Sequence, residues 1–297
     1  SKDRRKEFVY FFVHLEAEPE VEHLFASNNK PDGFMLQWTA PEGIFEMFII
    51  KISDRTGKQR QMSVSGEKRT EVINGLDEAT EYEIELFGTI AGRNFKPISG
   101  KALTGLGKPK GIRFSDVTDT SATVHWTVPN YSVDNYQVTY VPIHGDTPIT
   151  VTVGGGESHT VLPNLTPGVS YRVSIISVKG LEESEPASDT FTTALDKPHG
   201  LVAVNITDTT ALLHWQPTIA TVDGYVITYS TETMPPITER VSGNTVEFEM
   251  SLLYPGTEYT VKVYAMRETA KSAATTTQFT TGKHTHLNPQ PTCMLWY

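Results

Sequence analysis

Hydrophobic and polar residues alternate along most of the chain in short runs, a period-two pattern that is typical of β-strands with one buried face. Phe34, Leu36 and Trp38 alternate with their neighbours, and the same alternation leads up to Trp126 and Trp215. Turn-forming Asn-Gly and Pro-Gly pairs separate the runs. No convincing amphipathic helical stretch lies between them. The pattern therefore predicts an all-β fold.

The alternating pattern repeats every 88 or 89 residues. Four markers keep the same phase: a tryptophan, a tyrosine 44 or 45 residues later, a leucine six residues before that tyrosine, and a closing threonine. In chain order the markers are Trp38, Trp126 and Trp215; Tyr82, Tyr171 and Tyr259; Leu76, Leu165 and Leu253; and Thr104, Thr193 and Thr281. A fixed period of this kind is the signature of tandem modules, so we infer three copies of one module.

About seven short strands in each repeat predict a seven-stranded β-sandwich. The expected boundaries are a non-domain segment at 1–17, module 1 at 18–105, module 2 at 106–194, module 3 at 195–281, and a disordered or artefactual tail at 282–297. The linkers between modules are short, and Pro109 and Pro198 restrict their backbone. We therefore expect three tandem sandwiches arranged as an extended rod.

The repeated tryptophans and tyrosines are the expected structural core. Each tyrosine, with the leucine before it, fits a tyrosine corner, in which the hydroxyl bonds to nearby backbone while the ring covers the core. The single cysteine, Cys293, excludes an intrachain disulfide. This immunoglobulin-like pattern without a cysteine pair resembles the fibronectin type III domain, and the resemblance covers about residues 18–281.

A narrower resemblance lies in surface and linker residues that packing does not dictate. The stretches GLDEATEYEIELFG (75–88), KGLEESEPASDTFTTALDKPHGL (179–201) and NITDTTALLHWQPTIATVDGYVITYS (205–230) resemble consecutive repeats of a tenascin. This resemblance implies a secreted matrix glycoprotein that modulates cell adhesion, with integrins, other matrix proteins or proteoglycans as partners. It also implies that the region through which tenascins oligomerise is not in this chain. The alternative is the ectodomain of a cell-surface receptor or receptor phosphatase, which also strings such modules together.

Composition narrows the class of partner. The 297 residues carry a formal net charge of −10, with 35 acidic and 25 basic side chains, so nucleic acid and anionic membranes are poor partners. No segment reaches the roughly 18 apolar residues that a membrane-spanning helix needs. The longest apolar run, residues 8–13, follows a basic stretch as in a secretory signal, but it is short and no cleavage site follows it. We expect no membrane insertion.

The sequence holds no motif that predicts catalysis. Nucleophile-elbow, zinc-protease and phosphate-loop patterns are all absent, and the glycine run at 154–156 lies between strand patterns. His125 and His214 each precede a core tryptophan, so they face outward from their strands. We therefore expect neither an enzyme nor a cofactor or metal site.

Two kinds of surface site are expected from the tenascin resemblance. Three N-x-[ST] sequons make Asn130, Asn164 and Asn205 candidate glycosylation sites, with less room at Asn164. No Arg-Gly-Asp loop occurs. The turn at Asp223 and Gly224 resembles an integrin-recognition stretch of another tenascin repeat, where a carboxylate completes the coordination of the receptor's metal ion. It is also an ordinary Asp-Gly turn.

Overall fold

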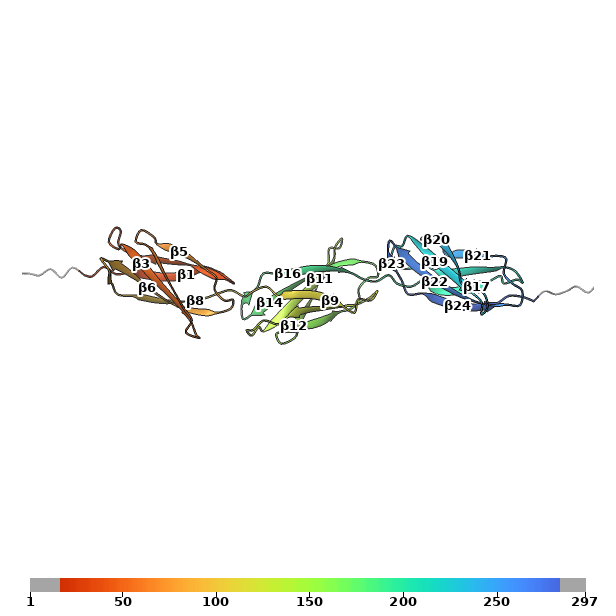
Figure 1. The fold of residues 1–297 in the computed structure, drawn as a ribbon, viewed down its shortest axis with the longest axis horizontal. Coiled ribbons are helices and arrows are strands. Elements are labelled where there is room, and N and C mark those ends of the chain that lie inside the picture. The colour runs from red at the N-terminus through yellow and green to blue at the C-terminus, as the bar shows by residue number, and fades with distance from the viewer. Residues whose placement is uncertain (1–16, 284–297) are drawn as a thin grey trace, which may run out of the picture. The chain divides into compact units, whose positions relative to one another are not determined.

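The computed structural model describes residues 17–283 and contains only strands, turns and irregular segments over that range (Figure 1). The chain divides into two compact units; the first extends to Lys108 and includes 130–134 and 177–185, and the second comprises the remaining described residues. No helix in the described range is long and apolar enough to cross a membrane. The expectations for 1–16 and 284–297 concern residues outside that range.

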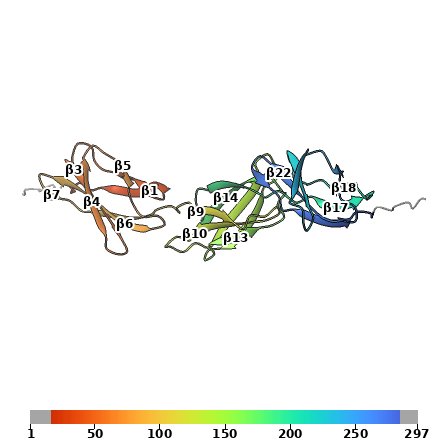
Figure 2. The same cartoon turned by 45° about the vertical axis from the view of Figure 1, so that its right-hand side comes forward.

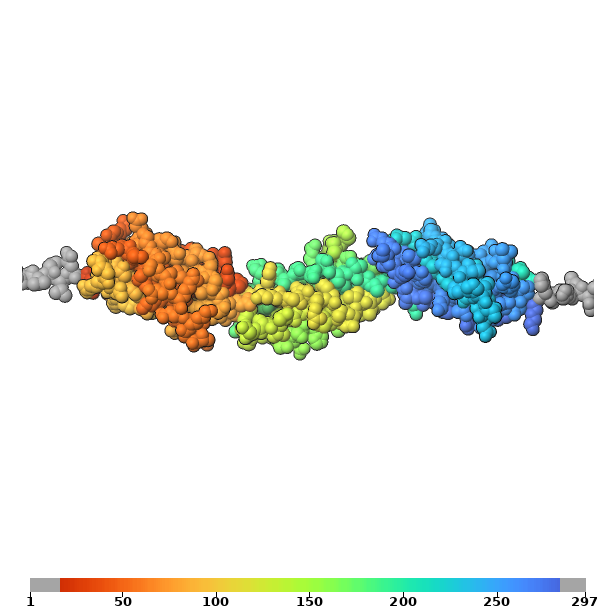
Figure 3. Space-filling model, in the orientation of Figure 1, coloured from red at the N-terminus to blue at the C-terminus, as the bar shows by residue number. Residues whose placement is uncertain are grey.

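Module 1 pairs a three-stranded sheet, β1-β2-β5, with a second sheet in which β3 and β6 are central and β4, β7 and β8 are added. Its strands are β1 Glu22–Lys30, β2 Gly33–Thr39, β3 Met47–Asp54, β4 Gln59–Ser65, β5 Thr70–Asn74, β6 Glu81–Ile90, β7 Arg93–Asn94 and β8 Ile98–Leu103. All strand pairs are antiparallel. Buried side chains from both sheets form one hydrophobic core between them. Figure 3 shows the outer surface in the same orientation as Figure 1.

Modules 2 and 3 repeat this topology strand for strand. Figure 2 shows the strands from a second direction. The strands of module 2 are β9 Lys110–Ser115, β10 Ala122–Thr127, β11 Asn135–Pro142, β12 Ile149–Gly154, β13 His159–Leu162, β14 Ser170–Lys179, β15 Glu182–Glu183 and β16 Ala187–Thr192. Those of module 3 are β17 His199–Val204, β18 Ala211–Gln216, β19 Gly224–Ser230, β20 Ile237–Ser242, β21 Glu247–Met250, β22 Glu258–Arg267, β23 Ala270–Lys271 and β24 Thr275–Thr280.

The predicted fold class is confirmed: three all-β sandwiches follow one another along the chain. Seven strands per module is approximately right, because each module has seven longer strands and one two-residue strand, β7, β15 or β23. These two-residue strands pair with the ends of β6, β14 and β22 and close a tight hairpin. The arrangement of the modules as a rod stays a prediction.

Period-two burial matches the sequence pattern because each strand presents alternate side chains to the core. Trp126 is buried and its ring lies 5.1 Å from that of Tyr136, the first aromatic residue of the next strand. Trp215 and Tyr225 form the same pair at 5.6 Å, centroid to centroid. In module 1 the pair is Trp38 with Phe48, at 5.4 Å. One buried aromatic pair therefore joins the two sheets in every module.

A tyrosine and a threonine satisfy the backbone of one turn residue in each module. In module 2, the Tyr171 hydroxyl accepts a hydrogen bond from the Thr166 N–H at 2.9 Å, and the Thr193 hydroxyl donates to the Thr166 carbonyl at 2.7 Å. In module 1, the Asp77 N–H donates to the Tyr82 hydroxyl and the Thr104 hydroxyl donates to the Asp77 carbonyl. In module 3, Tyr259 and Thr281 make the same two bonds to the backbone of Tyr254. All three threonines are buried, so each hydroxyl replaces a water that the turn would otherwise need.

Replacing Tyr171 with Phe should destabilise module 2 by about 1–3 kcal/mol, because the Thr166 N–H would lose its partner in a part-buried turn. The measurement is urea unfolding of the whole chain, with hydrogen exchange monitored separately for the peptides of each module. The control is Tyr254→Phe, since the Tyr254 side chain is 63% exposed. Equal protection of module 2 in Tyr171→Phe and in the parent would contradict the assigned role.

Candidate functional site

The turn predicted to contact a receptor ends the loop 217–223 of module 3, which connects β18 to β19. Asp223 is exposed and Gly224 is half-buried at the start of β19. The structure holds this loop from both ends, so its geometry follows from contacts distant in sequence. Those contacts determine what the turn can present to a partner.

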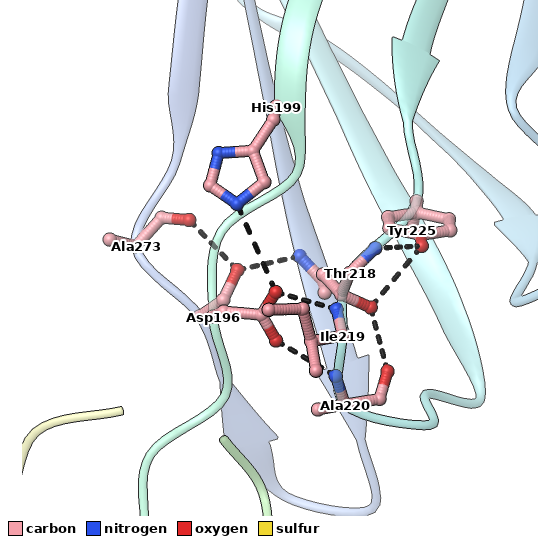
Figure 4. A network of polar contacts seen from close by, with 9 residues as sticks. Asp196, His199, Thr218, Ile219, Ala220, Tyr225 and Ala273 are labelled. Carbon is pink, nitrogen blue, oxygen red and sulfur yellow. Dashed lines mark hydrogen bonds and ion pairs between the residues drawn. The ribbon is translucent and has the colours of Figure 1, made fainter. Parts of the chain in front are cut away.

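Asp196, in the linker before β17, holds the middle of the loop (Figure 4). One of its carboxylate oxygens accepts a hydrogen bond from the Ile219 N–H at 2.6 Å, and the other accepts from the Ala220 N–H at 2.9 Å. Only 3% of Asp196 is exposed, and the His199 ring nitrogen Nε2 lies 4.0 Å from Oδ2. Two charge-assisted bonds in a buried position fix the loop backbone more firmly than neutral bonds would.

Tyr225 supports the same loop from the first core-facing position of β19. Its hydroxyl accepts a hydrogen bond from the Thr218 N–H at 3.0 Å, and the Thr218 hydroxyl donates to the Ala220 carbonyl at 2.8 Å (Figure 4). Since Tyr225 also packs against the core tryptophan, the loop is connected directly to the module's core.

Asp223 closes the far end of the loop. Its carboxylate oxygen Oδ2 accepts a hydrogen bond from the Glu268 N–H at 2.6 Å, and its own N–H donates to the Met266 carbonyl at 2.8 Å. Only glycine fits at position 224, since a Cβ there would lie 2.4 Å from the Val241 carbonyl oxygen. Asp223 and Gly224 therefore each have a local structural reason to be present.

The other two modules contain the same kind of contact, in which an acidic side chain at the end of the loop accepts the N–H of a turn. In module 2, Asp134 Oδ2 accepts a hydrogen bond from the Gly180 N–H at 2.7 Å. In module 1, Glu46 Oε2 accepts from the Ala91 N–H at 3.1 Å. Each acidic residue is exposed and holds the turn between the ten-residue strand and the two-residue strand of its own module: β6 and β7, β14 and β15, or β22 and β23. The carboxylate of Asp223 thus has one oxygen committed to the fold, and no hydrogen bond reaches Oδ1 from the described residues.

The three sequon asparagines lie on the surface. Asn130, Asn164 and Asn205 are all exposed. Asn164 and Asn205 adopt left-handed backbone conformations, with φ of 57° and 50°, which asparagine tolerates better than most residues. Asn164 lies two residues before Thr166, whose N–H and carbonyl are held in the tyrosine corner of module 2.

The outward histidines are placed as their strands predict. His125 and His214 lie half-buried on the outer face of the three-stranded sheets of modules 2 and 3. Burial, followed by the positive charges of Arg113 and His159, lowers the pKa of His125, and the Asp116 carboxylate opposes this effect. Among residues 17–283, no group of three or more His, Cys, Asp or Glu side chains could hold a metal ion.

Sequence reasoning missed Asp196 and treated its segment only as a linker. A signal was present: Leu195-Asp196-Lys197-Pro198 matches residues 106–109 except that glycine stands at Gly107 in place of the aspartate. A short acidic side chain in a linker is suited to accept backbone N–H groups. In module 2 a different donor-acceptor pair occupies the equivalent place, since the Gly107 N–H donates to the Tyr131 hydroxyl at 3.2 Å.

Comparison with known proteins gives a consistent result. The family described as "Fibronectin type III domain" matches residues 18–102, 107–190 and 196–279. Tenascin of Gallus gallus is 54% identical over 269 residues, which are 90% of this chain and 15% of that protein. Tenascin of Mus musculus is 52% identical over 268 residues, 90% of this chain and 13% of that protein. A solved two-domain fibronectin type III segment from chicken tenascin has 42% identity, a TM-score of 0.42, and covers 59% of this chain and 99% of its own.

Replacing Asp196 with Ala should destabilise module 3 by about 1–3 kcal/mol, because two loop N–H groups lose their acceptor. Asp196→Asn, which keeps one acceptor oxygen, should cost less. The measurement is urea unfolding, together with hydrogen exchange of the Ile219 and Ala220 amides by NMR. Glu232→Gln, at an exposed position of the same module, is the matched control. Unchanged exchange at both amides in Asp196→Ala would overturn the assignment.

Proposed function

The chain belongs to the fibronectin type III domain family, and from this membership and its similarity to tenascins we propose that it is a non-catalytic segment of an extracellular matrix glycoprotein. In this proposal the modules act as a spacer and modulate cell adhesion through loop contacts with receptors or matrix proteins. The tenascin relatives are extracellular matrix proteins, and the present chain spans 13–15% of the length of the two compared above.

The observation that carries the proposal is the pairing of a rigid core with braced, exposed turns in every module. Binding residues are commonly found on loops that a rigid scaffold positions. The loop 217–223 fits this description, because Asp196, Tyr225 and Asp223 fix its backbone while the turn stays exposed. A preorganised loop loses less conformational entropy when it binds a partner.

Integrins are the proposed receptor class, and the Asp223 turn is the proposed contact. The chemistry would use the carboxylate as an oxygen ligand for a divalent cation held by the receptor. The oxygen Oδ1 is the one that suits this role, since Oδ2 accepts the Glu268 N–H. Other matrix proteins or proteoglycans are further proposed partners. The receptor-ectodomain alternative rests on the fold alone.

The decisive experiment compares Asp223→Asn with Asp134→Asn in the whole chain, coated as a substrate for integrin-bearing cells. Each asparagine keeps an oxygen that can accept the bracing N–H and removes only the charge. We expect Asp223→Asn to lower attachment several-fold at an unchanged urea midpoint, and Asp134→Asn to attach cells as the parent does. Equal attachment by both variants would exclude the turn as the contact. Attachment and spreading on the parent no different from those on an inert protein would contradict the adhesion proposal itself.

Expression through a secretory pathway should add glycans at Asn130 and Asn205 more completely than at Asn164, because the tyrosine corner holds the backbone beside Asn164. The measurement is the mass of tryptic glycopeptides before and after enzymatic removal of N-glycans. Asn205→Asp is the control, because it removes one glycan attachment site while keeping a short side chain suited to the φ of 50°. Full occupancy of Asn164 with none at the other two would reverse the expectation.

A further inference from the structure

Two histidines face each other across neighbouring strands of module 2. His125 on β10 and His159 on β13 are direct partners in the antiparallel register. The Trp126 N–H donates to the Ser158 carbonyl at 2.9 Å, so the adjacent residues form the hydrogen-bonded pair and the histidines the non-hydrogen-bonded pair. In that arrangement the Cα atoms are about 4.5 Å apart and the side chains are closest. The two rings are stacked, with centroids 5.7 Å apart and 26° between their planes.

Hydrogen bonds around His125 determine which ring nitrogen carries the proton. The Ser115 hydroxyl donates its only hydrogen to Asp116 Oδ2 at 2.8 Å. Its oxygen lies 2.8 Å from His125 Nε2, so it accepts a hydrogen bond there and Nε2 is the protonated nitrogen. In neutral His125, Nδ1 therefore carries the free lone pair. Metal-binding histidines commonly have this arrangement, in which the other ring nitrogen donates to an oxygen connected to a carboxylate.

We propose that His125 and His159 form a two-histidine binding site for a divalent transition-metal ion. The ligands are Nδ1 of His125 and a ring nitrogen of His159, with water completing the coordination. His159 is exposed and makes no hydrogen bond with the described residues, so it can turn from the stacked position toward a shared ion without losing a partner. Imidazole prefers Cu²⁺, Ni²⁺ and Zn²⁺ over Mg²⁺ and Ca²⁺, and Cu²⁺ should bind most tightly of these.

Charged neighbours act on this site in opposite directions. On the other side of β10, Arg113 of β9 is the register partner of His125, and its positive charge disfavours a cation. The Asp116 carboxylate favours one, both by its charge and through the Ser115 hydroxyl. With two protein ligands and a nearby arginine, we expect an open site that exchanges its metal readily rather than one on which folding depends.

The corresponding positions of the other modules provide internal comparisons. In module 3 the pair is His214 and Glu247, with His214 Nδ1 3.6 Å from Oε1 of Glu247. In module 1 the pair is Gln37 and Thr70. The backbone register is the same in all three, so the side chains alone distinguish the sites. The paired imidazoles that the proposed site needs occur here only in module 2.

The test is titration of the whole chain with Cu²⁺, Ni²⁺ and Zn²⁺ by calorimetry. His125→Asn and His159→Asn should each weaken the Cu²⁺ site at least tenfold, while His214→Asn leaves it unchanged. Arg113→Gln should tighten binding, a result that a site elsewhere in the chain would not produce. Electron paramagnetic resonance of bound Cu²⁺ should show two imidazole nitrogens in the parent and one in either single variant. Urea midpoints of all variants verify that the modules stay folded.

His14, His284, His286 and Cys293 lie outside the described residues and carry potential ligands, so the titration is repeated with all four replaced. Tenfold weaker binding in His125→Asn and His159→Asn in that background supports the proposal. Binding within twofold of the parent in both variants, or loss of the parent's binding when only the four outside residues are replaced, would overturn it.

Discussion

Strand pairing satisfies most backbone groups of each sandwich, but the turn before the longest strand depends on the side chains of one tyrosine and one threonine in each module. The tyrosine ring covers the core while its hydroxyl accepts the N–H of a turn residue, and the threonine hydroxyl takes that residue's carbonyl. Because the threonine closes its module, the last strand is held to the turn that starts the longest one. The linker that follows the last strand therefore starts from a fixed position.

From this framework follows the double role of the acidic residues at the loop ends. Asp223, Asp134 and Glu46 each accept an N–H from a turn 45 or 46 residues later in sequence, so a side-chain acceptor oxygen has a structural role at this place whether or not anything binds. A receptor contact at Asp223 would therefore use a group that the fold already holds in position. Preorganisation of that kind would let an ordinary turn bind a partner without a change in its own backbone.

The strands, the core and the repeat could be predicted because alternation and phase are local properties of the sequence. The hydroxyl contact of Tyr171 is an example, because the leucine six residues before this tyrosine already predicts a tyrosine corner. The contacts of buried Asp196 and the stacking of His125 on His159 could not be predicted, since the partners lie 23 to 34 residues apart in sequence. Period two places both histidines on the outer face, but only the strand register brings them opposite each other.

One outward position shows where the modules are free to differ. The core-facing residues beside it are the tryptophans Trp38, Trp126 and Trp215, and all three are buried. The outward neighbours are Gln37, His125 and His214, paired with threonine, histidine and glutamate in turn. A change at a core position leaves a cavity or overpacks the interior, whereas a change in an outward cross-strand pair costs a fraction of that. Side chains specific to one module therefore occur on the outer faces and turns, whereas the interior packing is alike in the three modules.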